Sequence, residues 1–206
     1  MLLAIDTSSG TSVAVVDRDA GVLSEVGEAD TMRHAEVIGT LIREALELSG
    51  VPVSALSGVV AGMGPGPFTG LRVGIAAAKA FAIGAGRPLV PVVSHDAIAA
   101  ERFAAGQEGP LLVVTDARRR ERYWTAYSGV DDLGLPIRLD GPGLGKPDEL
   151  PHADLTRGDA TVVSAGRLGM IAEIRYANTR PFDPDEPLYL RSPDVTLSAG
   201  PKRVSA

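Results

Sequence analysis

Residues 62–74 read GMGPGPFTGLRVG, a glycine- and proline-rich stretch that follows a short apolar run. Glycine of this density is typical of loops that bind phosphate, but both common phosphate-binding templates fail here. A P-loop needs a lysine directly after its last glycine, and the first lysine is Lys79. A dinucleotide-binding loop needs a third glycine where Pro67 or Thr69 stands. Pro65 and Pro67 also lack the amide hydrogens that would bind a phosphate. The stretch therefore predicts a rigid turn between a strand and a helix.

The residues after this turn predict a helix from Leu71 to about Gly84 that is apolar on almost every side. Its small-residue side consists of Gly70, Gly74, Ala77, Ala78 and Phe81. An earlier helix is predicted from His34 to the stop at Gly50, with apolar residues over half of its circumference. So much apolar surface must be buried on more than one side. The small-residue side is predicted to pack either on the chain's own third helix or on a helix of another chain.

The rest of the sequence follows one plan twice. The runs LLAID and TSVAVVD predict two strands joined through Thr7–Gly10, and LLVVTDARRRERYWTAYSG repeats this hairpin from Leu111. Ser94 is placed to cap a third helix, and RLGMIAEIRYA predicts a further short helix. We expect irregular structure over 129–158 and one more strand at ATVVSAG, 160–166. Alternating strands and helices indicate an α/β architecture with mixed sheets.

Composition limits the class of protein. The chain has 206 residues and no cysteine, which favours a reducing compartment, and its formal net charge is −6. No basic leader is visible, and Lys79, Gly84 and Pro88 interrupt the longest apolar stretch. We therefore expect a cytoplasmic protein without a membrane span. No net basic charge attracts nucleic acid, so any contact with nucleic acid must be local or made through a partner.

Four motifs, AIDTS, GMGPGPFTGLRVG, TDARRRERYW and PLYLRSP, together closely resemble the bacterial TsaB family, also called YeaZ. The resemblance spans nearly the whole chain and implies an actin-like (ribonuclease-H-like) two-lobed α/β fold with a reduced second lobe. We expect a first lobe with partner-binding helices at 1–109, a second, smaller lobe at 110–190, and a flexible tail at 191–206. Pro67 stands where the family often has serine, which makes the loop stiffer.

The resemblance also implies a function. Family members support the modification of tRNA to threonylcarbamoyladenosine beside the anticodon, as partners of the catalytic subunit TsaD. The ATPase TsaE joins them, and TsaC makes the activated donor. We expect this chain to be a non-catalytic subunit that pairs with a TsaD-like protein, or with itself in isolation, and that meets tRNA only through the complex. The residues expected at the interface are Leu41, Ala45, Gly70, Gly74, Ala78 and Phe81.

We expect no catalytic residue, cofactor or metal in this chain. TsaD-like proteins carry two histidines one helical turn apart, which can bind one metal ion. Here Ala99 stands one turn after His95, where the second histidine would be. His95 is therefore predicted to be a residue at a helix start or on the surface and not a metal ligand. Polar residues follow Asp6 where an actin-type phosphate hairpin has a glycine. Asp6 and Asp116 end equivalent strands, but too few acidic residues adjoin them to favour metal-assisted hydrolysis.

Two readings of the function and two of a basic cluster stay open. The alternative function is a stand-alone actin-like ATPase or a peptidase, although the sequence contains no G-x-S-x-G motif, no H-E-x-x-H motif and no cysteine. The basic cluster predicts either a solvated turn or a contact with a tRNA backbone or an acidic partner surface. Its members are Arg118, Arg119, Arg120 and Arg122.

Overall fold

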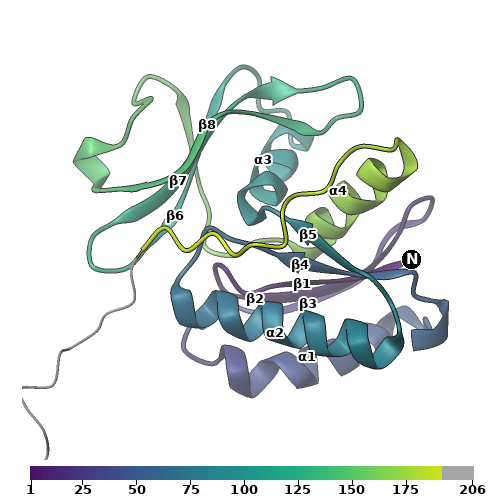
Figure 1. The fold of residues 1–206 in the computed structure, drawn as a ribbon. Coiled ribbons are helices and arrows are strands. Elements are labelled where there is room, and N and C mark those ends of the chain that lie inside the picture. Colours follow the sequence, from purple (N-terminus) through teal and green to yellow (C-terminus); the bar gives the residue numbers. More distant parts are fainter. Residues whose placement is uncertain (192–206) are drawn as a thin grey trace, which may run out of the picture.

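The computed structural model describes residues 1–191, which fold into two β-sheets and the helices packed on them (Figure 1). The first sheet has the strand order β3-β2-β1-β4-β5 and the second the order β8-β7-β6-β9. The strands of the first sheet are β1 (Leu2–Asp6), β2 (Thr11–Asp17), β3 (Gly21–Glu28), β4 (Gly58–Gly62) and β5 (Leu89–Val92). The strands of the second are β6 (Leu111–Asp116), β7 (Arg122–Val130), β8 (Pro136–Gly145) and β9 (Thr156–Asp159).

The predicted repetition of one plan is confirmed. In the first sheet β1 pairs antiparallel with β2 and parallel with β4, and in the second β6 pairs antiparallel with β7 and parallel with β9. An aspartate ends the first strand of each hairpin, with Asp6 opposite Ser12 and Asp116 opposite Arg122. The second sheet has no strand equivalent to β5 among the described residues, which makes the second lobe the smaller one.

Helices α1 (His34–Ser49) and α2 (Phe68–Ala85) cover the outer face of the first sheet (Figure 1). Both end at a glycine in the left-handed conformation, Gly50 and Gly86. Such a C-terminal glycine satisfies the last carbonyl groups without steric strain. An apolar core lies between this face of the sheet and the two helices. It consists of alternate residues of β1, β2 and β4 and of the inward sides of α1 and α2.

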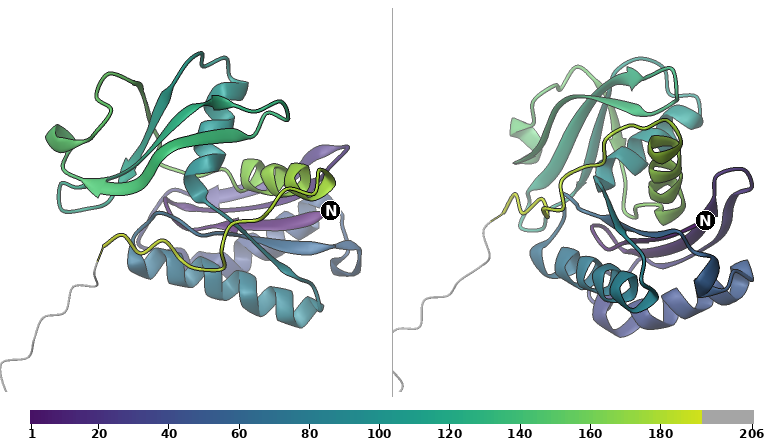
Figure 2. Two further views of the ribbon diagram at one scale, coloured as in Figure 1. Left: turned by 45° about the horizontal axis from the view of Figure 1, so that its top comes forward. Right: turned by 45° about the vertical axis from the view of Figure 1, so that its right-hand side comes forward.

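Helices α3 (Ser94–Ala104) and α4 (Ala165–Ala177) lie between the two sheets (Figure 2). Helix α3 follows a strand of the first sheet but packs on the second, whereas α4 comes late in the chain and packs on the first. A single apolar core therefore joins both sheets through these helices. All strands of the first sheet precede residue 110 and all strands of the second sheet follow it. Helices α3 and α4 do not respect this division, because each packs on the sheet formed by the other part of the chain. The division into domains 1–109 and 110–190 stays a prediction.

A C-terminal strap, residues 178–191, returns from α4 along one side of the molecule to the start of α2 (Figures 1 and 2). The amide of Leu188 donates to the carbonyl of Met63, and the ring of Tyr189 lies 4.8 Å from that of Phe68. Asp183 of the strap accepts hydrogen bonds from Arg138 and Arg175. The strap therefore ties the glycine-rich turn to both sheets. The predicted flexible tail at 191–206 lies outside the described residues apart from Arg191.

Three sequence-based predictions of secondary structure are wrong. The stretch 129–158 is not irregular but contains β8, β9 and a short 3-10 helix, Pro147–Glu149. Strand β8 lies at the edge of its sheet, where prolines and glycines cost few ladder hydrogen bonds. The strand expected at 160–166 is absent, and α4 begins at Ala165. Ser94 does not cap α3, because its hydroxyl bonds to Asp6 and to the amide of Gly64.

Candidate functional site

The glycine-rich stretch packs against the first hairpin, and its prediction as a rigid strand-to-helix turn is confirmed. A Cβ at Gly66 would lie 2.8 Å from the Ser8 backbone, and one at Gly62 would collide with the Asp6 carboxylate. Gly64 has a φ of +91°, which favours glycine. These glycines therefore make room for the β1–β2 turn.

Asp6 is closed off at the centre of this contact. Its side chain is 1% exposed, and Oδ1 accepts from the Ser8 amide at 2.8 Å and from the Ser8 hydroxyl at 2.6 Å. Oδ2 accepts from the Ser94 hydroxyl at 2.5 Å. Burial raises the pKa of Asp6, although these hydrogen bonds act in the opposite direction. The carboxylate at the end of the first strand is therefore buried and hydrogen-bonded within the protein, and it is not accessible to a ligand.

Asp116, at the equivalent position of the second hairpin, lies in a different environment. It is exposed and forms an ion pair with Arg122. The turn that follows holds three successive arginines in the left-handed conformation, with φ values of 61°, 48° and 64° for Arg118, Arg119 and Arg120. Arg118 donates to Thr31 of the first lobe at 3.4 Å. Arg119 and Arg120 line a mainly basic hollow with Lys146, Arg191 and one acidic residue, Glu121, and we call it the basic hollow.

His95 is at the predicted helix start, but it is not a surface residue. It is fully buried, with Nδ1 2.7 Å from the Thr125 hydroxyl and Nε2 2.9 Å from that of Thr115. Burial lowers the pKa of His95 from 6.5 to about 3, and nearby Arg138 adds to the effect. The ring is therefore neutral at physiological pH. Within residues 1–191 no three His, Asp or Glu side chains gather in a way that could hold a metal ion.

The residues predicted to face a partner on α2 lie inside the lobe instead. A Cβ at Gly74 would lie 2.9 Å from Thr7 Cγ2 and closer still to its hydroxyl, and one at Gly70 would lie 2.8 Å from the Thr7 carbonyl. Ala78 is completely buried. The assignment of Gly70, Gly74 and Ala78 to an interface is corrected, because these residues pack on the β1–β2 turn and the sheet, whereas Ala77 of the same predicted side lies on the outer face of the helix.

The three remaining interface residues also belong largely to the internal core. On α1, Ala45 is completely buried and Leu41 is 8% exposed. Phe81 on α2 is half-buried and packs against the same core. Their side chains are therefore committed mainly to the lobe itself.

The opposite side of α2 faces outward and is also apolar. Only six of its eighteen residues are buried, and Ile83 is 82% exposed. The outer face of α2 consists of Thr69, Val73, Ala76, Ala77, Ala80, Ile83 and Gly84. The flanking charges are already engaged, since Lys79 pairs with Asp185 of the strap and Arg72 stacks on the Phe68 ring. Helix α2 alone among the described helices is long and apolar enough to span a membrane by length and composition, and it lies along the first sheet with one side in the core.

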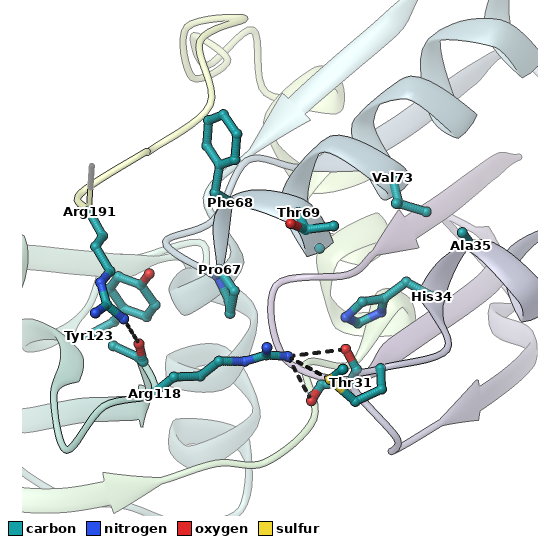
Figure 3. A pocket seen from close by; sticks show the side chains of 13 residues that line it. Thr31, His34, Ala35, Pro67, Phe68, Thr69, Val73, Arg118, Tyr123 and Arg191 are labelled. Atoms are coloured by element: carbon teal, nitrogen blue, oxygen red, sulfur yellow. Dashed lines mark hydrogen bonds between the residues drawn. The ribbon is translucent and has the colours of Figure 1, made fainter. Parts of the chain in front are cut away.

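A cavity of about 550 Å³ opens beside the start of α2 (Figure 3). The β3–α1 turn and α1 contribute Thr31 and His34, the start of α2 contributes Phe68 and Thr69, and the second hairpin contributes Arg118. Figure 3 shows Arg118 reaching from the second hairpin toward Thr31 and His34. The cavity is separate from the closed Asp6 carboxylate, because no residue of the Thr7–Gly10 turn is among its described lining residues.

The two matching hairpins, the repeated strand order and the helices held between two sheets define a two-lobed α/β protein of the actin-like class. The family model of TsaD, tRNA N6-adenosine threonylcarbamoyltransferase, matches residues 15–135. The TsaB protein of Escherichia coli, named a tRNA threonylcarbamoyladenosine biosynthesis protein, is 30% identical over 165 residues, which cover 80% of this chain and 70% of that protein. The chain belongs to the TsaB (YeaZ) family.

Two further comparisons extend over almost the whole chain. An uncharacterized protein of Mycobacterium tuberculosis is 38% identical over 203 residues, which cover 94% of this chain and 93% of that protein. A crystal structure from Pseudomonas aeruginosa, described as similar to the peptidase YeaZ, superposes with a TM-score of 0.78 at 23% identity and covers 92% of this chain and 99% of its own. At this level of identity the crystal structure supports the fold alone.

Proposed function

We propose that this chain is a non-catalytic subunit in the synthesis of threonylcarbamoyladenosine in tRNA, and that it acts in the cytoplasm as partner and activator of a TsaD-like catalytic subunit. A TsaE-like ATPase joins the pair. The relatives named TsaB and the match to the TsaD family model support the pathway and the partner. Without its partner the chain forms a homodimer through the same surface.

The outer face of α2 is the observation that carries this proposal. It is a nearly uncharged surface of alanine, valine and isoleucine, and the neighbouring helix α1 exposes Ala35 and Gly39. Exposed alanines and glycines allow the backbone of a second helix to approach closely, and a Cβ added at Gly39 or Gly84 would have no neighbour within 4 Å. An exposed apolar surface of this extent favours association with another helix pair.

The described polar groups favour a non-catalytic role over the alternative of a stand-alone ATPase or peptidase. A phosphate-binding hairpin needs free backbone amides and an accessible carboxylate, whereas Ser8 and Ser94 occupy the Asp6 carboxylate. A peptidase needs a nucleophile beside a base. Ser94 does not meet this need, because its hydroxyl donates to a buried carboxylate, and His95 bonds to two threonines.

Size-exclusion chromatography of the chain with a TsaD-like protein tests the proposed interface. The double variant Ala76→Arg and Ala80→Arg places two charges on the outer face of α2 and should abolish co-elution while leaving the circular dichroism spectrum unchanged. Thr40→Arg is the matched control, because Thr40 is exposed on the charged side of α1. Normal co-elution of the double variant would exclude this face as the interface.

The basic hollow is the proposed route to tRNA in the assembled complex. The proposed contact with a phosphate backbone involves the arginine cluster of the β6–β7 turn, of which Arg119 and Arg120 line the hollow together with Lys146 and Arg191. Arg191 also lies 3.6 Å from Glu121, and Lys146 lies 2.9 Å from Glu149. These acidic neighbours weaken the field of the hollow, which favours contact through a complex over binding by the chain alone.

A further inference from the structure

We propose that the cavity beside the start of α2 is a binding site for a small organic anion, a carboxylate or phosphate attached to an apolar body. The cavity shares Ala35, Thr69 and Val73 with the edge of the proposed partner surface, but the proposal does not depend on the proposed function. The cavity volume of about 550 Å³ falls within the range of small-molecule sites.

Two largely buried side chains, His34 and Tyr123, line this cavity, and each has a polar atom without a described protein partner. His34 is 6% exposed, and its Nδ1 lies 2.7 Å from the Thr11 hydroxyl, but no described residue bonds to its Nε2. Tyr123 is 1% exposed, and within residues 1–191 its hydroxyl has no hydrogen-bond partner. Both side chains line the cavity, and a ligand oxygen there would satisfy them.

The charge around the cavity selects an anion. Arg118 lines it, and no carboxylate of the described residues lies within ion-pair distance of its guanidinium, whose bonds to Thr31 are long at 3.4 Å. Arg191 also lines the cavity, where it donates to the Ala117 carbonyl at 3.0 Å and lies 3.6 Å from Glu121, so Arg118 is the main source of positive charge. No Asp or Glu is among the described lining residues. In a chain of net charge −6, a cavity lined by two arginines and no acid marks a local preference for negative charge.

The start of α2 adds backbone donors to the same wall. Pro67 precedes the first turn, and no described side chain caps it, so the amides of Phe68 and Thr69 retain free hydrogens at the positive end of an eighteen-residue helix. If the Thr11 hydroxyl donates to Nδ1 of His34, the ring proton lies on Nε2 and points into the cavity. The cavity is thus lined by hydrogen-bond donors, which suit an oxyanion.

Apart from Thr31 and Thr69, the rest of the cavity wall is apolar, and it sets the body of the ligand. Phe68, Val73, Met32 and Ala35 contribute aromatic or aliphatic surface. A free inorganic ion would leave this surface in contact with water. The combination favours a compact aromatic or aliphatic acid or phosphate monoester.

Calorimetric titration of the full chain tests the site with three probes: phenyl phosphate, benzoate and the neutral benzyl alcohol. We expect at least one anion to bind about tenfold more tightly than benzyl alcohol, because an ionic hydrogen bond contributes that much. The arm that binds more tightly identifies phosphate or carboxylate as the preferred head group. Equal binding of all three probes, or no binding of either anion at millimolar concentration, would overturn the proposal.

Variants locate the binding. Arg118→Gln should weaken anion binding about tenfold, and Tyr123→Phe about threefold, with little effect on benzyl alcohol. Arg120→Gln is the matched control, since Arg120 lies in the same turn but is not among the residues that line the cavity. In NMR spectra the ring signals of His34 should shift on binding while those of buried His95 stay in place. Anion binding that Arg118→Gln and Tyr123→Phe both leave unchanged would refute this site.

Discussion

The turns of the two hairpins occupy equivalent places in the two sheets, yet they have opposite environments. The β1–β2 turn is buried, and the glycine-rich stretch closes over it. The β6–β7 turn is exposed and carries arginines. Two consecutive residues of α3 hold the two hairpins, since Ser94 bonds to Asp6 and His95 bonds to Thr115 and Thr125. One plan has thus produced a structural contact in the first lobe and an open, charged surface in the second.

The two strand-ending aspartates give the largest expected difference between the hairpins. Asp6→Ala should lower the free energy of unfolding by on the order of 3 kcal/mol, because it leaves the buried donors of Ser8 and Ser94 unsatisfied. Asp116→Ala should change it little, because an exposed ion pair contributes little. Urea denaturation measures both. Similar losses for the two variants would contradict the contrast between a closed and an open turn.

A pair of glycine substitutions tests the closure of the first turn more finely. In a helix, Gly→Ala normally stabilises by about 0.5–1 kcal/mol. We expect this gain for Gly39→Ala, whose Cβ meets open space. Gly74→Ala should instead destabilise by about 1–3 kcal/mol, because its Cβ would overlap Thr7. Thermal unfolding should therefore shift in opposite directions, and a stabilising Gly74→Ala would show that the helix does not pack on the turn as described.

Low pH should lower the free energy of unfolding through His95, which bonds to the second hairpin. Its pKa is about 3 in the folded chain and near 6.5 when unfolded, so the unfolded state binds the extra proton below about pH 6.5. Stability is then lost as the pH falls from about 6.5 toward 3, by about 1–2 kcal/mol between pH 7 and pH 5. The raised pKa of Asp6 acts in the opposite direction, since its protonated form is favoured by folding.

The variant His95→Gln isolates the histidine from the other titrating groups. Denaturation at pH 7 and at pH 5 should show a smaller loss of stability for the variant than for the wild type. His34, whose pKa is also lowered by burial, remains in both proteins and cancels in the comparison. Equal losses would mean that His95 is not held neutral inside the protein.

The smallest expected effect concerns the exposed turn. Changing Arg119 and Arg120 to glutamate should leave the fold intact, because both side chains are exposed, but should weaken tRNA binding by the assembled complex. The salt dependence of binding should also flatten, since fewer counterions are released. Filter binding at several salt concentrations measures this. Unchanged binding and an unchanged slope would leave the arginines as a solvated turn.

The sequence predicts the hairpins, the rigid glycine-rich turn and most helix boundaries, because periodicity and turn residues are local signals. It does not predict which side of α2 faces the sheet. Both sides are small or apolar, and the contact of Gly74 with Thr7 depends on a turn far away in the sequence. The two sides differ in their glycines. Gly70 and Gly74 lie where the helix backbone comes close to Thr7, and the outer side carries mainly alanines, because no other described part of the chain comes so close there.

The polar interior is equally invisible to local patterns. Ser94 and His95 have the sequence context of a helix cap and a surface residue, but both are buried because the two sheets close over α3. The cluster of Asp96, Arg138, Arg175 and Asp183 joins residues from four separate segments, with distances of 2.5–3.1 Å between the charged atoms. Such clusters follow from the fold and cannot be read from spacing.

Reconstituted modification of tRNA tests the central claim most directly. A TsaD-like protein, a TsaE-like ATPase and a source of the activated threonylcarbamoyl donor are incubated with substrate tRNA, with and without this chain, and the modified nucleoside is measured by mass spectrometry. We predict modification only when the chain and the TsaD-like protein are both present, none with the chain in place of the TsaD-like protein, and none with the Ala76→Arg and Ala80→Arg double variant. Full modification without the chain, or transfer by the chain in the absence of the TsaD-like protein, would contradict the account.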